Sequence, residues 1–479
     1  MAGCTALGGL AARGVLTPRH AKQVLFAKDR STVVLRVAGM DGGIGDDVLV
    51  VRLLAGEISS LGAGAVDMSW IGQGSGVLVS NTAGDLVAFP LDGAASMTLA
   101  RATCDHLTSP DGSRVLSFED CNGSPATLTS IDTRTGSRTK LGRTALNTSG
   151  LRPNVVFSPG GRWAAFREPE PALDGSVATG GLIHIVDDKD SSYALSSAPA
   201  ACCPFFASDD VLLFSTIAGG PVPADVYAHD LGSGDTSRVI AKGVDFESYF
   251  GYRVSPGGQW MLAAIIPADD FSPYALAAFG VADGREVALV GNLFPFWSTE
   301  VAWYSFAFAA DNRHVLYLTA DRPMHTALVA SLGGAPADLS AEPSFAIPPT
   351  GNLVALTETR STPMRVRLTD LDTTQDVASA EATSTPTQVT FTPDGRSLVY
   401  IESASDSAPA RLRHLSGHTG SLTELARWTS NQLALEYACC NEPSPYPIDP
   451  TGCFAMVDSD LDGGTRLVLL PESGEPLAP

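Results

Sequence analysis

Short apolar stretches alternate with tight polar turns along most of the chain, and the pattern repeats. In a typical repeat, the apolar stretch Val389 to Phe391 precedes a turn and the apolar run Leu398 to Ile401 follows it. The second run of a repeat is nearly continuous, as in Met261 to Ile265, which favours a strand buried on both faces. A third stretch alternates apolar and polar residues, as in Leu182 to Val186, and a short fourth stretch follows a glycine-bearing turn. The pattern predicts four antiparallel strands per repeat.

The turn between the first and second strands has a recognisable sequence. Its clear copies are Ser109-Pro110-Asp111-Gly112, Ser158-Pro159-Gly160-Gly161, Ser255-Pro256-Gly257-Gly258, Thr392-Pro393-Asp394-Gly395 and Asp449-Pro450-Thr451-Gly452, with looser copies at Asp209-Asp210, Asp311-Asn312 and Pro348 to Gly351. Proline presets φ near about −65°, and glycine takes up the bend that bulkier residues resist. The motif therefore marks the same tight turn in successive repeats.

Ten repeats can be placed in register along the chain. They fall near residues 23–62, 66–101, 103–143, 152–198, 203–241, 250–290, 301–339, 344–382, 387–426 and 434–477, and the first two lack the proline-glycine turn. Successive four-stranded antiparallel sheets are typical of the blades of a β-propeller. We therefore predict an all-β fold in which residues 1–22 form an N-terminal tail and residues 23–479 form a propeller of eight to ten blades. Two smaller propellers in tandem are the alternative.

The Ser-Pro-Asp-Gly turn followed by an apolar strand resembles the TolB-like or WD40-like (PD40) repeat family of bacterial propellers. The resemblance covers residues 100 to 455 well and the flanks poorly. It implies a platform for protein partners, or a propeller that accompanies a separate catalytic domain. A hydrolase domain of the prolyl oligopeptidase type would need a Gly-x-Ser-x-Gly elbow. The sequence holds no such elbow, and the repeats occupy the whole chain, so we expect no peptidase activity.

Charge excludes one class of partner. The formal net charge is −21, with 31 Lys and Arg against 52 Asp and Glu. The arginines are scattered singly and form no basic stripe in the sequence, whereas phosphate binding needs clustered cations. Nucleic acid is therefore not an expected partner. No apolar run is long enough for a transmembrane segment.

The eight cysteines are best interpreted by their register within the repeats. Cys104 enters the first strand of the third repeat, and Cys121 lies between the second and third strands of the same repeat. Both positions fall on one face of one blade, so we predict a disulfide between them, the alternative being two free thiols. The adjacent pairs Cys202-Cys203 and Cys439-Cys440 lie five repeats apart and cannot bridge each other. Each pair is a candidate vicinal disulfide.

The first residues suggest a compartment. Ala2-Gly3-Cys4 matches the end of a bacterial lipobox, in which the cysteine becomes the lipidated first residue. No charged and apolar signal region precedes it, so the signal would have to be missing from the sequence. Together with the predicted disulfides and the propeller resemblance, this match predicts a periplasmic, outer-membrane lipoprotein or secreted location. A cytoplasmic protein with reduced thiols is the alternative.

Two sets of carboxylates are candidate sites. The residue seven positions after the turn glycine is Glu119, Glu168, Glu358 or Glu402 in four repeats, at the end of the second strand. A partial ring of carboxylates there would attract a cationic partner or a metal, although charge at strand ends is also common for solubility. Asp458, Asp460 and Asp462 match the first half of a calcium loop, but the closing glutamate is absent, which favours an ordinary hairpin turn.

These observations predict a non-catalytic binding scaffold of the cell envelope that presents one propeller face to a protein or glycan partner. We predict no cofactor apart from the weak calcium site. The alternative is a propeller lyase or hydrolase that uses Glu119, Glu168, Glu358 or Glu402 as acid or base at the channel mouth. A subunit with a purely structural role in an assembly is a third interpretation.

Overall fold

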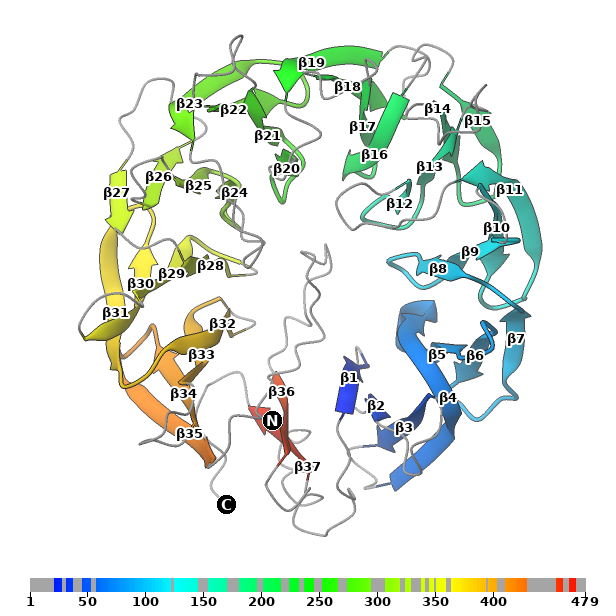
Figure 1. The fold of residues 1–479 in the computed structure, drawn as a ribbon, viewed down its shortest axis with the longest axis horizontal. Helices are drawn as coiled ribbons and strands as arrows, with labels where there is room; N and C mark the ends of the chain where they lie inside the picture. The colour runs from blue at the N-terminus through cyan, green and yellow to red at the C-terminus, as the bar shows by residue number, and fades with distance from the viewer. Residues whose placement is uncertain are drawn as a thin grey trace.

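The protein is all-β, and its sheets are arranged around a central axis as the blades of a β-propeller are (Figure 1). The computed structural model describes residues 21–27, 32–37, 45–52, 57–121, 125–144, 154–169, 181–195, 201–216, 224–231, 237–244, 252–265, 274–293, 306–318, 324–328, 337–340, 344–348, 350–358, 363–392, 395–402, 410–428, 454–459 and 465–470. The described part of the chain holds no helix with the length and apolar character needed to cross a bilayer.

The first five units contain the following elements. Unit 1 holds β1 (Ala21–Phe26), β2 (Thr32–Val37), β3 (Asp46–Arg52) and the start of β4 (Glu57–Ile71); unit 2 holds the end of β4, the short 3-10 helix η1 (Gly72–Gly74), β5 (Gly76–Asn81), β6 (Leu86–Pro90) and β7 (Met97–Ala100). Unit 3 holds β8 (Asp105–Thr108), β9 (Arg114–Glu119), β10 (Ala126–Asp132) and β11 (Arg138–Thr144). Unit 4 holds β12 (Val155–Phe157), β13 (Ala164–Pro169), β14 (Gly181–Val186) and β15 (Ser192–Ala194); unit 5 holds β16 (Ala201–Ser208), β17 (Val211–Thr216), β18 (Ala224–Asp230) and β19 (Ser237–Val244).

The remaining units continue the series. Unit 6 holds β20 (Tyr252–Val254), β21 (Trp260–Ile265), β22 (Tyr274–Gly280) and β23 (Glu286–Leu293); unit 7 holds β24 (Phe306–Phe308), β25 (His314–Leu318), β26 (Met324–Leu328) and β27 (Ala337–Ser340). Unit 8 holds β28 (Ser344–Ala346), β29 (Leu353–Glu358), β30 (Met364–Asp370) and β31 (Gln375–Ala382); unit 9 holds β32 (Pro386–Phe391), β33 (Ser397–Glu402), β34 (Ala410–Ser416) and β35 (Leu422–Trp428). The last pair, β36 (Phe454–Ser459) and β37 (Thr465–Leu470), is a two-stranded sheet among the described residues.

The prediction of four-stranded antiparallel sheets is confirmed. In each of the first nine units the strands pair in chain order, and the unit bounds follow the predicted repeats. β1 begins at Ala21, just before the predicted start of the repeats. Units 1 and 2 share one sheet because β4 pairs with β3 through its first half and with β5 through its second half. In Figure 1 the first strand of a unit lies near the axis and the fourth at the rim, as β8 and β11 illustrate.

The turn between the first two strands has the predicted geometry. In Ser109, Ser158, Ser255 and Thr392, the carbonyl oxygen accepts a hydrogen bond from the turn glycine, at 2.8 to 2.9 Å. The hydroxyl of the same residue accepts a second hydrogen bond, at 2.9 to 3.2 Å, from a backbone N–H at or just before the start of the second strand. The donors are Arg114, Trp163, Trp260 and Ser397. The turn glycines have φ between +67° and +77°, which explains why glycine stands there. The fifth clear copy, Asp449 to Gly452, lies outside the described residues.

A β-bulge recurs where the third strand of a unit pairs with the fourth. It is present in units 1, 2, 3, 5, 6, 7, 8 and 9. The extra residue on the fourth strand is always aliphatic: Leu61, Leu99, Leu141, Ile240, Leu289, Leu339, Val377 and Leu425. A bulge increases the local twist and turns an extra side chain to the other face of the strand. Ile240, for example, is buried in this way.

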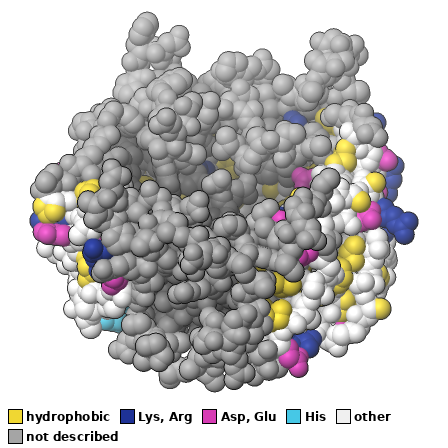
Figure 2. All heavy atoms as spheres, turned by 60° about the horizontal axis from the view of Figure 1, so that its bottom comes forward, with side chains coloured by type: hydrophobic (Ala, Val, Ile, Leu, Met, Phe, Trp, Pro, Cys, Tyr) yellow, Lys and Arg dark blue, Asp and Glu magenta, His cyan; other side chains and the backbone are white. Residues whose placement is uncertain are grey.

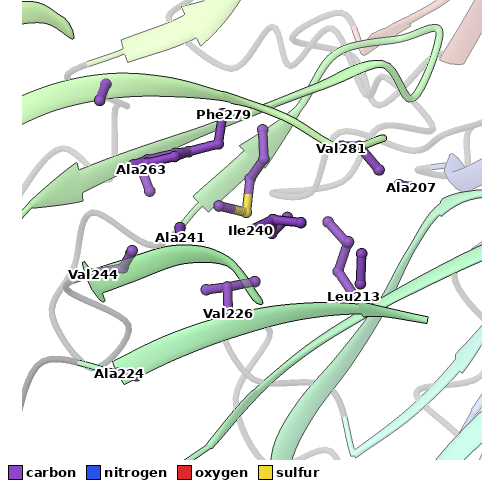
Figure 3. Close-up of a cluster of buried hydrophobic side chains, with 13 residues drawn as sticks. Ala207, Leu213, Ala224, Val226, Ile240, Ala241, Val244, Ala263, Phe279 and Val281 are labelled. Carbon is purple, nitrogen blue, oxygen red and sulfur yellow. The ribbon is translucent and has the colours of Figure 1, made fainter. Parts of the chain in front are cut away.

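The hydrophobic core lies between units. Eight apolar clusters of the described residues each join one unit to the next, from the junction of units 1 and 2 to that of units 8 and 9. Figure 3 shows the junction of units 5 and 6, where Leu213 and Ile240 meet Ala263 and Phe279. Along β21, Met261 and Ala263 pack toward unit 5, whereas Leu262 and Ala264 pack toward unit 7. Burial on both flanks explains the continuous apolar runs in the sequence.

Polar contacts also tie neighbouring units. The guanidinium of Arg114 in unit 3 donates to the carbonyl oxygens of Asp187, Gly161 and Arg162 in unit 4, at 2.6, 2.9 and 3.2 Å. The Gly160 N–H donates to Asp209 at 2.6 Å, which ties unit 4 to unit 5. The junctions of unit 4 with units 3 and 5 are therefore held by both apolar packing and directional hydrogen bonds.

Candidate functional site

The four predicted glutamates occupy equivalent positions in four sheets. Three of them end the second strand of their unit, and Glu168 is the residue before the end of β13. Each lies opposite a third-strand residue: Glu119 opposite Thr127, Glu168 opposite Leu182, Glu358 opposite Arg365 and Glu402 opposite Arg411. The four glutamates therefore occupy equivalent positions in units 3, 4, 8 and 9, and the structure does not gather their carboxylates into one cluster.

Each carboxylate contacts the third-strand residue two positions further along. Thr129 donates to Glu119 at 3.3 Å, His184 Nε2 lies 2.7 Å from Glu168, Arg367 Nε lies 2.9 Å from Glu358, and Arg413 Nε lies 3.3 Å from Glu402. Glu119 also forms an ion pair with Arg138 on β11. The carboxylates are thus engaged within their own sheets, which weakens the argument for a ring that attracts a metal or a cationic partner. The diagonal partners were not predicted from sequence.

The pair Glu168 and His184 is the most accessible of the four. The Glu168 side chain is 40% exposed, and the His184 ring stacks on Phe166 with ring centroids 4.8 Å apart. A carboxylate within ion-pair distance of an imidazole is an arrangement that can exchange protons with a ligand. Of the four predicted glutamates, Glu168 is therefore the best placed for acid–base chemistry.

Glu402 has the opposite environment. It is fully buried, and Thr383 from unit 8 donates to it at 2.5 Å while Arg413 faces it from the third strand. Burial, together with the negative charge of Glu402, raises the pKa of Tyr400 above its usual value. Glu402 consequently serves the junction between units 8 and 9 and offers no surface to a ligand.

A histidine between two aspartates, which no motif in the sequence indicates, lies at the junction of units 7 and 8. His314 is buried, its Nδ1 lies 2.5 Å from Asp311, and its Nε2 lies 3.9 Å from Asp372 of unit 8. Arg313 also reaches Asp372, at 3.2 Å. Burial would raise the pKa of Asp311, but hydrogen bonds from the His314 ring and from the backbone N–H groups of Arg313 and His314 lower it to about 2.

Cys104 and Cys121 form a disulfide, with their Cα atoms 6.2 Å apart. It links the start of unit 3 to the loop after β9, which are the positions that the repeat register placed on one face. Cys202 and Cys203 lie in β16, but their side chains are outside the described set, and so are Cys4, Cys439 and Cys440. The vicinal disulfides and the lipidated cysteine stay predictions.

The calcium loop also stays a prediction. Asp458 lies in β36, and Asp460 and Asp462 are outside the described residues. Within the part of the chain that the structure describes, no group of three His, Cys, Asp or Glu side chains is placed to hold a metal ion.

The structure aligns three cations that are separated in the sequence. Arg138, Lys140 and Arg143 on β11 lie opposite Ile131, Thr129 and Thr127 of β10, and the bulge at Leu141 brings Arg143 to the same face as the other two. We call these three residues the β11 cationic face. Elsewhere on the surface, Figure 2 shows Lys and Arg side chains beside Asp and Glu on the described part of the face it presents.

Solved structures show what fold this chain is similar to. A eukaryotic initiation factor matches with a TM-score of 0.53 and 12% identity over 80% of this chain and 94% of that chain. Oligogalacturonate lyase from Vibrio parahaemolyticus matches with a TM-score of 0.35 and 11% identity over 67% of this chain and 89% of that chain. TolB from Acinetobacter baumannii matches with a TM-score of 0.27 and 15% identity, over 60% and 75%. At these identities the likeness concerns the fold alone.

No family model matches the sequence, and no curated protein does. The TolB-like repeat family accordingly stays a prediction from the turn motif.

Proposed function

We propose that the chain is a non-catalytic binding scaffold of the bacterial cell envelope that presents one propeller face to a protein or glycan partner. One observation carries the proposal: from unit 1 to unit 9, every junction has a shared apolar cluster. Such junctions hold the loops at the strand ends in fixed relative positions, and fixed loops on rigid elements make an interaction surface precise.

We also propose that the ten units close one ring of the TolB-like kind. The uninterrupted series of shared clusters favours one ring over two tandem propellers, because each smaller propeller would pack its last unit on its own first unit. In Figure 1, β36 and β37 lie between unit 9 and unit 1, the place of a tenth unit.

Affinity capture tests the scaffold role. The purified protein, immobilised and incubated with envelope extract at low and moderate salt, should retain a protein or a glycan that an unrelated acidic protein does not retain. Recovery of no partner at any salt would count against the scaffold.

The envelope location is supported by the disulfide of Cys104 and Cys121, because such bonds persist in oxidising compartments. Mass spectrometry of the mature protein from its native source should find this disulfide and a lipid on Cys4. Reduced thiols and an unmodified Cys4 would favour the cytoplasmic alternative.

A second candidate function, a lyase or hydrolase, is favoured by the exposed pair of Glu168 and His184. If the protein cleaves a glycan or an ester, Glu168→Gln should abolish that activity, whereas Glu358→Gln should leave it unchanged because Glu358 is tied to Arg367. Inactivity of the wild-type protein across glycan and ester panels would remove this candidate.

A further inference from the structure

The β11 cationic face lies on an edge strand. β11 is the last strand of the sheet β11-β10-β9-β8, and no described strand pairs with its outer side. In Figure 1, β11 runs along the rim of the molecule. Arg138, Lys140 and Arg143 are exposed. Among the described residues, the three charged side chains are exposed and no strand occupies the outer backbone edge of β11.

The open side of β11 offers backbone hydrogen-bonding groups. The Asp132 N–H donates to the Ser137 carbonyl at 3.0 Å, so the backbone of Ser137 faces β10. Backbone groups of an antiparallel strand alternate between its two sides. The N–H and C=O groups of Arg138 and Lys140 consequently point away from β10, toward the open edge.

Only one of the three charges of this face is paired with a carboxylate within its sheet. Arg138 pairs with Glu119, and Arg143 donates to the Pro125 carbonyl at 2.9 Å. Among the described residues, no carboxylate lies within ion-pair distance of Lys140 or Arg143. The β10 residues opposite them, Thr129 and Thr127, carry no charge.

The corresponding strand of unit 8 shows the contrast. There, Asp376 and Glu381 of β31 lie on one face, opposite Thr369 and Arg365 of β30. Asp376 pairs with Arg367 at 3.1 Å and Glu381 with Arg365 at 3.9 Å. The charges of that edge strand are balanced inside its own sheet, whereas Lys140 and Arg143 of β11 have no carboxylate partner among the described residues of a chain whose net charge is −21.

We propose that β11 docks an extended acidic segment of a partner protein, which adds to the sheet of unit 3 as a fifth strand. Strand addition satisfies the open backbone groups, and carboxylates at alternate positions of the segment face Arg138, Lys140 and Arg143. Alternate residues of a strand are about 6.6–6.8 Å apart, so a segment with every second residue acidic matches the spacing of the cations. An anionic glycan would meet the charges but not the backbone.

This inference deepens the proposed scaffold function and rests on it. The probe is a fluorescein-labelled peptide of alternating Glu and Thr, titrated into the full-length protein and followed by fluorescence anisotropy. Lys140→Glu/Arg143→Glu should bind the peptide at least about tenfold more weakly than wild type, because charge complementarity becomes repulsion. The matched control is Lys242→Glu, which reverses an exposed lysine on the rim strand β19 and should bind like wild type. Circular dichroism confirms that each variant is folded.

Two further arms separate strand addition from simple charge attraction. N-methylation of alternate amides in the peptide should likewise weaken binding at least about tenfold, because it removes the backbone donors without changing the charge. Equal binding of the methylated peptide, or displacement of the peptide by polygalacturonate at matched charge, would overturn the proposal in favour of a polyanion surface. Absence of binding to any acidic probe would overturn it as well. The scaffold function fails separately, only if capture from envelope extract recovers no partner with wild type.

Discussion

Two glycines with nearly the same backbone conformation differ in their surroundings. Gly258 in the turn of unit 6 has φ +70°, and a Cβ there would lie 2.2 Å from the Ala207 carbonyl oxygen of unit 5. Gly420 in a hairpin of unit 9 has φ +67°, and a Cβ there would meet nothing within 4 Å. Gly258 thus permits both a positive φ and the close approach of unit 5, whereas Gly420 permits only the positive φ.

We expect Gly258→Ala to destabilise the protein more than Gly420→Ala. The conformational cost alone is about 1 kcal/mol, so Gly420→Ala should change the free energy of unfolding by that amount. Gly258→Ala should cost about 3 kcal/mol or more, because the backbone of unit 5 must also shift. Urea unfolding followed by circular dichroism measures both. Equal costs would mean that the turn does not pack against unit 5 as described.

Asp311 predicts a pH dependence. Its pKa is lowered from the ordinary value to about 2, so the carboxylate contributes stability that is complete above about pH 5 and is lost as the pH falls toward 2. Asp311→Asn lacks this contribution. The difference in unfolding free energy between wild type and variant should therefore shrink by about 1 kcal/mol from pH 5 to pH 2.5, after allowance for solvent screening. A difference that stays constant over this range would contradict the role of the His314 contact.

At the scale of the element, the bulge that recurs in eight units inserts one extra aliphatic residue into each of those fourth strands. Ile240 is 3% exposed and packs in the cluster between units 5 and 6, whereas Val377, at the equivalent bulge of unit 8, is 42% exposed. The same backbone irregularity therefore carries a buried side chain in one unit and an exposed one in another.

Truncation of the two bulge residues should separate these cases. Ile240→Ala should cost about 2–5 kcal/mol, because it removes buried methyl groups and leaves a cavity. Val377→Ala should change stability by no more than about 0.5 kcal/mol. Denaturant midpoints measure both, and a large effect at Val377 would show that β31 is covered in solution.

Strand order and turn geometry were predictable from sequence because both are local. Four strands per repeat follow from apolar periodicity, and the turn follows from residues as close as Ser109 and Gly112. The bulge and the diagonal partners of the glutamates were not predictable, because they depend on pairing register across loops of unequal length. Glu168 meets His184 across a longer connection than the one between Glu358 and Arg367. For the same reason the sequence does not predict that Arg143 and Lys140 share a face of β11. They do so only because Leu141 is the extra residue of a β-bulge between them.

At the scale of the whole molecule, we expect Arg114 to contribute to global stability, because its side chain joins unit 3 to unit 4. Arg114→Met keeps most of the side-chain stem but leaves the carbonyl oxygens of Asp187, Gly161 and Arg162 in unit 4 without their donor. We expect a loss of about 2–4 kcal/mol in unfolding free energy. Arg114→Lys should recover only part of it, because an ammonium cannot match three acceptors as the planar guanidinium does. The control Arg134→Met, at an exposed arginine of the same unit, should change stability by less than about 0.5 kcal/mol.

The placement of the core between units has a consequence for biosynthesis. Each apolar cluster is formed by two successive units. A unit that has just left the ribosome or a translocation channel therefore exposes one apolar face until the next unit has been made. The growing chain therefore exposes the apolar face of its most recently made unit throughout synthesis. Early binding of a chaperone to this face would reduce aggregation. In Figure 1, β36 and β37 lie between unit 9 and unit 1. A chain cut after one of the first eight units would keep an uncovered apolar flank, so we expect it to aggregate more readily than the full chain.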